Sequence, residues 1–95
     1  MGYNKINRHM VVVKELVWDD WNREHLTKHN ISPEEIKEVF KGNYQTIESY
    51  RKRILIVGKT KTGRNIAVVL SPEDRNLQLH GKGIYYVITA FEKEV

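Results

Sequence analysis

The chain has 95 residues, of which 40% are hydrophobic and 29% are charged, and its formal net charge is +4. That length is enough for one domain and too short for two. Cysteine is absent, which excludes a disulfide scaffold, a thiolate metal site and a cysteine nucleophile. No apolar run is long enough to span a membrane, and no signal-peptide pattern opens the chain. We therefore expect one cytoplasmic domain over residues 1–95, with residues 1–9 forming a flexible N-terminal arm.

The first predicted element is a strand over Met10–Val17, where β-branched and apolar residues dominate. Asp19 and Asp20 follow it, and either side chain can cap the start of a helix. The sequence then predicts a short helix over Trp21–His29. Asn30 can adopt the left-handed conformation that commonly ends a helix.

A second helix has stronger signals at both ends. Ser32 at the N-cap, Pro33 at the first helical position and Glu35 three residues after the cap form a capping box with the favoured proline. A cation and a glycine in Lys41–Asn43 are typical of a helix end. The apolar stripe between these ends consists of Ile36, Val39 and Phe40.

From Tyr44 onward the hydrophobic period changes to that of strands. Residues 58–63 carry turn chemistry, so the strands on either side of them are expected to form a hairpin. Short turns favour antiparallel pairing, so the predicted fold class is α+β, with two N-terminal helices packed on one face of an antiparallel β-sheet meander. The predicted strands are Tyr44–Tyr50, Arg53–Val57, Ile66–Leu70 and Ile84–Phe91.

The positive charge is concentrated in the segment Arg51–Arg64, which contains no acidic residue. Arg and Lys at alternating positions of a strand share a face, so a basic ribbon of this kind can contact phosphates and favours nucleic acid as the partner. The alternative is a solvated hairpin whose charges serve solubility and protect a sheet edge. The basic residues are Arg51, Lys52, Arg53, Lys59, Lys61 and Arg64.

His25 and His29 are four residues apart and are expected on one face of the first helix. Three interpretations stay open. Two histidines at this spacing can hold zinc, but no third ligand is indicated. A histidine can also transfer protons near neutral pH, or can simply hydrogen-bond a neighbouring strand. Trp18 and Trp21, which flank the helix start, are interpreted as structural anchors rather than as platforms for base stacking.

Several short motifs occur in an order and spacing that resemble the BrnT toxin family over the range Trp18–Ala90. In the first half they are Trp18-Asp19, Asn22, His25-Leu26, Lys28-His29-Asn30-Ile31 and Ser32-Pro33-Glu34-Glu35. In the second half they are Gly58-Lys59-Thr60, Gly63-Arg64 and Val87-Ile88-Thr89-Ala90.

The resemblance implies a RelE-like fold and a metal-independent ribonuclease without a cofactor, which is the toxin of a type II toxin–antitoxin pair and inhibits translation. Its implied partners are RNA and a cognate DNA-binding antitoxin. Beside these, we expect a homodimer as a further assembly and no membrane partner. By position, the resemblance makes Lys28, His29 and Arg64 catalytic, with His29 exchanging protons while the two cations hold the phosphate charge. The RNA-binding residues that it implies are Arg51, Arg53, Lys59, Lys61 and His25.

Two departures from the family pattern keep a second function open. The arginine that follows the closing alanine in the family is Phe91 here, and the basic C-terminal helix of many members is missing. The alternative is therefore a non-catalytic domain of the same fold that binds nucleic acid or a protein.

Overall fold

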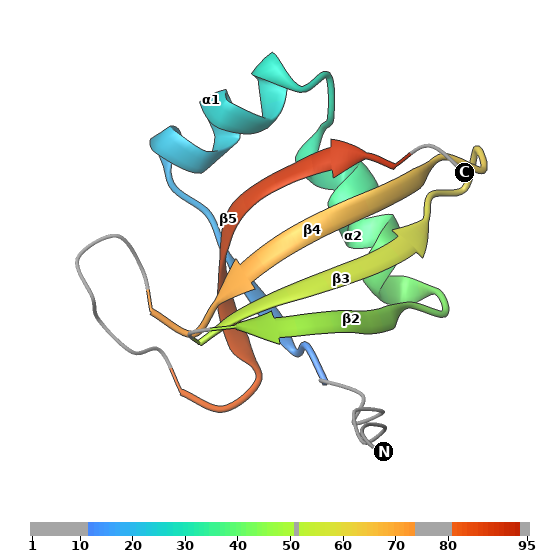
Figure 1. Cartoon of the computed structure of the whole chain (residues 1–95). Helices are drawn as coiled ribbons and strands as arrows, with labels where there is room; N and C mark the ends of the chain where they lie inside the picture. Colours follow the sequence, from blue (N-terminus) through green and yellow to red (C-terminus); the bar gives the residue numbers. More distant parts are fainter. Residues whose placement is uncertain (1–11, 51, 74–80, 94–95) are drawn as a thin grey trace.

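The computed structural model describes residues 12–50, 52–73 and 81–93, and within these ranges it shows two helices and five strands (Figure 1). Neither helix is long and apolar enough to cross a membrane. The predicted N-terminal arm, residues 1–9, lies outside the described residues. The elements are β1 (Glu15–Val17), α1 (Asp20–Lys28), α2 (Pro33–Lys41), β2 (Gln45–Tyr50), β3 (Arg53–Lys59), β4 (Asn65–Ser71) and β5 (Ile84–Glu92).

The five strands form one mixed sheet in the order β1-β5-β4-β3-β2. Strands β2 to β5 are antiparallel neighbours, as predicted, but β1 pairs with β5 in parallel. The α+β class is therefore confirmed, and the prediction of a wholly antiparallel meander is wrong. A short turn forces its two strands to be antiparallel, but β1 and β5 lie at opposite ends of the chain, so no turn sets their relative direction.

Strand β1 is shorter than the predicted strand over residues 10–17. Residues 12–14 are not in a strand, and residues 10 and 11 lie outside the described part of the chain. The first paired residues are Glu15 and Ile84, and the backbone N–H groups of Lys14 and Glu15 both donate to the carbonyl of Gly83, at 2.8 and 3.1 Å. Strand β1 begins there because β5 itself begins at Ile84 and offers no earlier ladder position.

Helix α1 begins and ends one residue before the predicted helix. Asp19 is its N-cap, and Asn30 after its end has a φ of 60°, as expected for the left-handed conformation. The prediction that Trp21 is a buried anchor is wrong, because this side chain is 38% exposed. The buried face of α1 instead carries Asn22 and Leu26, which are four residues apart and both fully buried.

Helix α2 confirms the signals in its sequence. The Ser32 hydroxyl accepts a hydrogen bond from the backbone N–H of Glu35, and the Glu35 carboxylate accepts one from the backbone N–H of Ser32. Ile36 and Val39 are fully buried, and Phe40 packs against the core from its edge. The predicted capping box and apolar stripe are both present.

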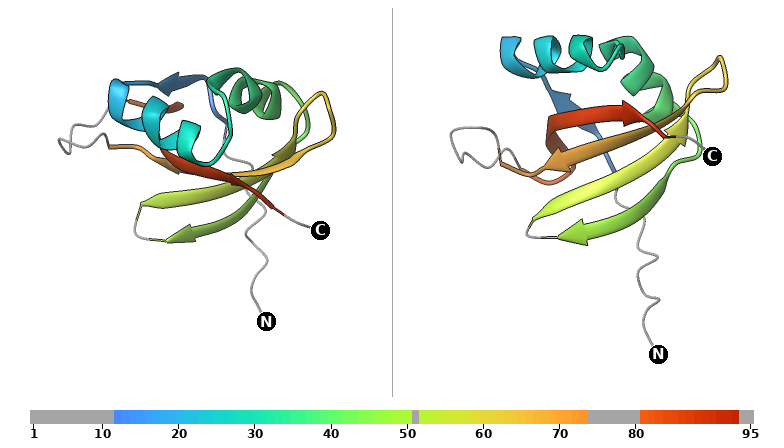
Figure 2. Two further views of the ribbon diagram at one scale, coloured as in Figure 1. Left: turned by 90° about the horizontal axis from the view of Figure 1, so that it is seen from above. Right: turned by 45° about the horizontal axis from the view of Figure 1, so that its top comes forward.

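The core lies between the sheet and the two helices, which both lie on the same side of the sheet (Figure 2). Helix α2 contacts β3 and β4, while α1 contacts β5. Burial alternates along β3, so Ile54 and Ile56 point into the core, while Leu55 and Val57 point to the other side. In the last strand Tyr86 is fully buried and its neighbour Tyr85 is half-buried against the core.

The side of the sheet that faces away from the helices is called the open face below. The strand register groups its residues into two rows that cross β3, β4 and β5. Phe91 is the most exposed of them, at 40%, and Arg53 and Lys59 are on the same side of β3 at its two ends. The two rows are Leu55, Val69 and Thr89, and Val57, Ala67 and Phe91.

Candidate nucleic-acid interface

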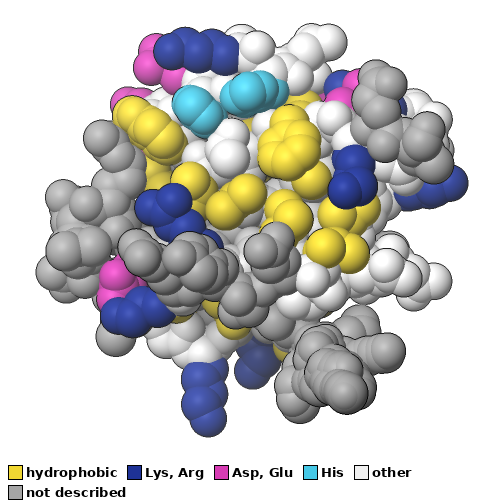
Figure 3. All heavy atoms as spheres, viewed as in Figure 1, with side chains coloured by type: hydrophobic (Ala, Val, Ile, Leu, Met, Phe, Trp, Pro, Cys, Tyr) yellow, Lys and Arg dark blue, Asp and Glu magenta, His cyan; other side chains and the backbone are white. Residues whose placement is uncertain are grey.

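The open face presents an apolar surface (Figure 3), and β3 carries a cation near each of its ends. Leu55 and Val57 are half-buried in its centre, between Arg53 and Lys59. Six residue steps separate the two cations, which corresponds to about 20 Å along a strand. The face can therefore offer apolar contact to bases and two separated positive charges to phosphates.

The remaining basic residues of the hairpin are placed differently. Lys52 forms an ion pair with Glu73 at 3.0 Å, and Lys61 follows the end of β3, where its backbone N–H donates to Glu38 of α2. Arg51 lies outside the described residues. The predicted basic ribbon is therefore reduced, on the open face, to Arg53 and Lys59.

The two histidines of α1 extend an aromatic row along the outer side of that helix. The Trp21 and His25 rings are stacked, with centroids 4.9 Å apart and planes 8° apart, and the His25 and His29 rings meet edge to face at 5.2 Å. Figure 3, which views the open face, shows the histidine side chains at the margin of its hydrophobic patch. The histidine side chains are thus visible in the same view as this patch, although α1 itself packs against β5 on the helical side of the sheet.

Lys28 and His29 end α1 and are exposed, and Arg64 lies close to this end of the helix. A shallow cavity of about 360 Å³ is lined by Arg64 together with Thr27 and Asn30, which flank the Lys-His pair. The Arg64 guanidinium donates to the backbone carbonyl of Asn30 at 3.2 Å. Arg64 is thus placed beside the backbone that follows the Lys-His pair, but neither Lys28 nor His29 lines the cavity that contains Arg64.

Arg64 is already held by two carboxylates. Its guanidinium lies 2.7 Å from Glu35 in α2 and 3.0 Å from Glu92 in β5, and its side chain is 24% exposed. The hydrogen bonds to Glu92 and Glu35 raise the pKa of Arg64 above its ordinary value. A phosphate can reach this cation only by competing with a carboxylate.

The same contacts change the pKa of Glu35. Burial raises the pKa of this carboxyl, but the hydrogen bonds from the Ser32 backbone and from Arg64, together with the Arg64 charge, outweigh that effect. The net result is a pKa below its ordinary value. The Glu35 carboxylate is therefore charged, and the ion pair formed, throughout the neutral range.

Several residues of the motifs that carry the resemblance have structural partners that lie far away in the chain. The Asn22 side-chain amide donates to the carbonyls of Val17 and Val87, both at 3.0 Å, and its oxygen accepts from the Asp19 backbone N–H. The Tyr86 hydroxyl donates to the Asp19 carboxylate at 2.9 Å. A polar residue three positions after an N-cap was the available signal for this arrangement.

Within the described residues, no group of three or more His, Cys, Asp or Glu side chains lies close enough together to hold a metal ion. The family described as Domain of unknown function (DUF4258) matches residues 22–92, and the chain belongs to this family. The matched range runs from the buried Asn22 of α1 to Glu92. It therefore includes His25, His29 and Arg64, together with the open face. No curated protein and no solved structure matches the chain.

Proposed function

We propose that the chain is a cytoplasmic, metal-independent ribonuclease of the BrnT-like toxin class, with a RelE-like fold and a cognate DNA-binding antitoxin. The observation that supports the proposal is that Arg64 lies beside the end of α1, where its guanidinium donates to the backbone carbonyl of Asn30, the residue after the Lys28-His29 pair. RNA would lie across the open face, with Arg53 and Lys59 contacting its backbone.

The chemistry needs one proton acceptor and a cationic environment for the phosphate. The His29 imidazole takes the proton of a ribose 2′-hydroxyl, and that oxygen attacks the adjacent phosphorus. The bond from phosphorus to the 5′ oxygen breaks, this oxygen takes a proton from water, and a cyclic phosphate remains. Lys28 and Arg64 stabilise the negative charge that develops on the phosphate oxygens.

Arg64 enters this reaction only by exchanging a carboxylate for the phosphate. Glu92 is the partner to be displaced, because its side chain is 50% exposed, whereas that of Glu35 is 22% exposed and belongs to a capping box. We expect Glu92→Gln to increase RNA cleavage, since it frees one side of the guanidinium. Rates of cleavage of a defined RNA by the two proteins provide the measurement, and an unchanged or lower rate contradicts a role for Arg64 in holding the phosphate.

Induced expression of the chain in cells tests the proposed ribonuclease activity. The wild-type chain is expected to slow growth and fragment RNA, and His29→Ala is expected to lower the cleavage rate at least about 100-fold, the usual size of a proton-transfer contribution. Lys37→Ala, at an exposed position of α2, is the matched control and should retain full activity. A wild-type chain that neither slows growth nor alters RNA would exclude the ribonuclease.

A second candidate function is favoured by the two carboxylates on Arg64 and by Phe91 at the position of the family arginine. In that case the same open face binds RNA, or an acidic segment of a partner protein, without cleavage. Fluorescence anisotropy of a labelled single-stranded RNA as a function of salt measures the binding. Affinity should fall steeply with salt for the wild type, and the slope should decrease by about 1.4 when Arg53 and Lys59 are both changed to Gln.

Replacing Lys37 and Lys41 of α2 by Gln removes the same charge from the other side of the sheet, so this variant should bind RNA like the wild type. Binding without cleavage would support the second function. Absent binding, or binding insensitive to salt, would contradict both RNA functions.

A further inference from the structure

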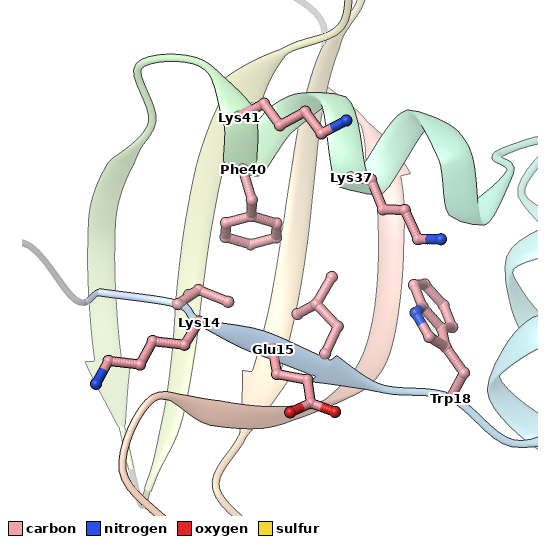
Figure 4. A pocket seen from close by; sticks show the side chains of 8 residues that line it. Lys14, Glu15, Trp18, Lys37, Phe40 and Lys41 are labelled. Atoms are coloured by element: carbon pink, nitrogen blue, oxygen red, sulfur yellow. The ribbon is translucent and has the colours of Figure 1, made fainter.

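A second cavity, of about 460 Å³, opens between β1 and α2 on the helical side of the sheet (Figure 4). It exists because α2 packs over β3 and β4, whereas β1 lies beyond β5 at the far edge of the sheet. The Phe40 and Tyr44 rings meet edge to face at 5.0 Å near the end of α2, and the Tyr44 hydroxyl accepts a hydrogen bond from the Val13 backbone at 3.3 Å. These contacts tie the start of the β1 segment to the end of α2.

The cavity has an apolar lining that the protein itself does not cover completely. Leu16 and Trp18 contribute to it from β1 and the residue after it, and Phe40 points toward β1 from α2. All three side chains pack against the core yet remain half-buried. Two aromatic rings and an aliphatic side chain around a space of this volume suit a small flat molecule, because ligand cavities commonly have volumes of about 300–1,000 Å³.

The charges around this lining are mainly positive. Lys14, Lys37 and Lys41 line the cavity together with a single carboxylate, that of Glu15. Within the described residues, no ion pair engages any of the three lysines. Figure 4 shows Lys37 reaching from α2 toward Trp18, whereas the Lys14 side chain and the Glu15 carboxylate both point away from α2.

A preference of helix ends for cations explains Lys41, which lies in the last turn of α2. It does not explain Lys37, which lies in the middle of α2. An amphipathic anion fits an apolar wall from both elements with cations on α2, because its apolar body replaces water on the rings while its charge meets the lysines.

We propose that this cavity binds a small organic anion of the aromatic carboxylate class. Its apolar ring contacts Leu16, Trp18 and Phe40, and its carboxylate faces Lys37 and Lys41. The site lies on the opposite side of the sheet from the open face, so it is independent of the proposed RNA function. Binding of the anion in this cavity can therefore be tested independently of RNA cleavage.

The probes that test it are 1-naphthoate and its neutral analogue 1-naphthalenemethanol, each titrated into the full chain and followed by two-dimensional NMR. Naphthoate is expected to shift the Trp18 indole signal saturably at millimolar concentration. The alcohol should bind about fivefold to tenfold more weakly, the size expected when exposed charge pairs are lost. Replacement of Lys37 and Lys41 by Gln should remove the difference between the two probes.

A double replacement of Lys59 and Lys61 by Gln is the matched control, because it removes equal charge outside the cavity and should leave naphthoate binding unchanged. Thermal melts followed by circular dichroism verify that each variant is folded. The proposal is overturned if naphthoate does not bind, if the alcohol binds equally well, or if the shifts occur at Trp21 and Phe91 instead of Trp18.

Discussion

The Asn22 side chain shows how one residue can join three parts of the fold. It is fully buried at the start of α1, where its amide meets the carbonyls of Val17 at the end of β1 and Val87 in β5. Its oxygen completes the capping box with Asp19. All the polar atoms of a buried amide are thus satisfied by backbone groups, so its removal leaves several buried groups without a partner.

We therefore expect Asn22→Ala to lower the free energy of unfolding by about 2–4 kcal/mol, since each unsatisfied buried group costs about 1–3 kcal/mol. Urea denaturation at neutral pH measures the change. Thr27→Ala is the matched control in the same helix, because the Thr27 hydroxyl donates an exposed hydrogen bond to the Arg23 carbonyl. A loss for Asn22→Ala as small as that of the control would show that the amide does not join these elements.

At the scale of elements, the contact between α2 and β3 depends on the absence of a side chain at Gly58. A β-carbon placed there would lie 2.7 Å from a methyl group of Val39 and 3.2 Å from the β-carbon of Tyr44. Real side chains do not approach so closely, so the helix would have to move away from the sheet. Gly58 was interpreted from sequence as a turn residue, but it belongs to β3 and pairs with Ile66 of β4.

Gly58→Ala is accordingly expected to lower the free energy of unfolding by about 1–3 kcal/mol, as is usual for overpacking in a core. Gly42→Ala provides the comparison, because a β-carbon at that helix end would meet nothing closer than 3.8 Å and its φ of −101° suits any residue. Thermal or urea denaturation of both variants is the measurement. Equal stabilities of the two variants would contradict a tight contact between α2 and β3.

For the whole molecule, Arg64 connects segments that are far apart in the chain. Its guanidinium reaches the connection between the helices at Asn30, the start of α2 at Glu35 and the end of β5 at Glu92. Two of these contacts are ion pairs, and the more buried carboxylate, Glu35, has a lowered pKa. This arrangement couples the packing of α2 on the sheet to pH.

A carboxyl whose pKa is lower in the folded state stabilises the fold fully above its ordinary value of 4.5, and this stabilisation disappears as the pH falls through the folded pKa. We expect Glu35→Gln to be less stable than the wild type at neutral pH, with the difference narrowing below pH 4.5. Glutamine still serves the capping box, so the comparison isolates the charge. Urea denaturation over pH 2–7 measures the free energy of unfolding of both proteins. A difference between them that stays constant with pH would contradict the ion pair.

The local features of this fold were predictable from sequence. Both helices, the Ser32 capping box, the left-handed Asn30 and the hairpin of β3 and β4 follow from residues that lie close together in the chain. The position of the cations on β3 also follows from the strand period, which places Arg53 and Lys59 on one face. Short-range sterics and hydrogen bonds decide these features, so the sequence alone determines them.

Only the tertiary structure decided the parallel pairing of β1 with β5, the exposure of Trp21 and the two carboxylate partners of Arg64. The cavity between β1 and α2 belongs to the same group. Each of these depends on segments that are distant in the chain, and periodicity within one segment carries no information about which other segment will lie beside it. The positive charge of the chain was visible in its sequence, but the part of it that remains on the open face was settled by the packing of the helices on one side of the sheet.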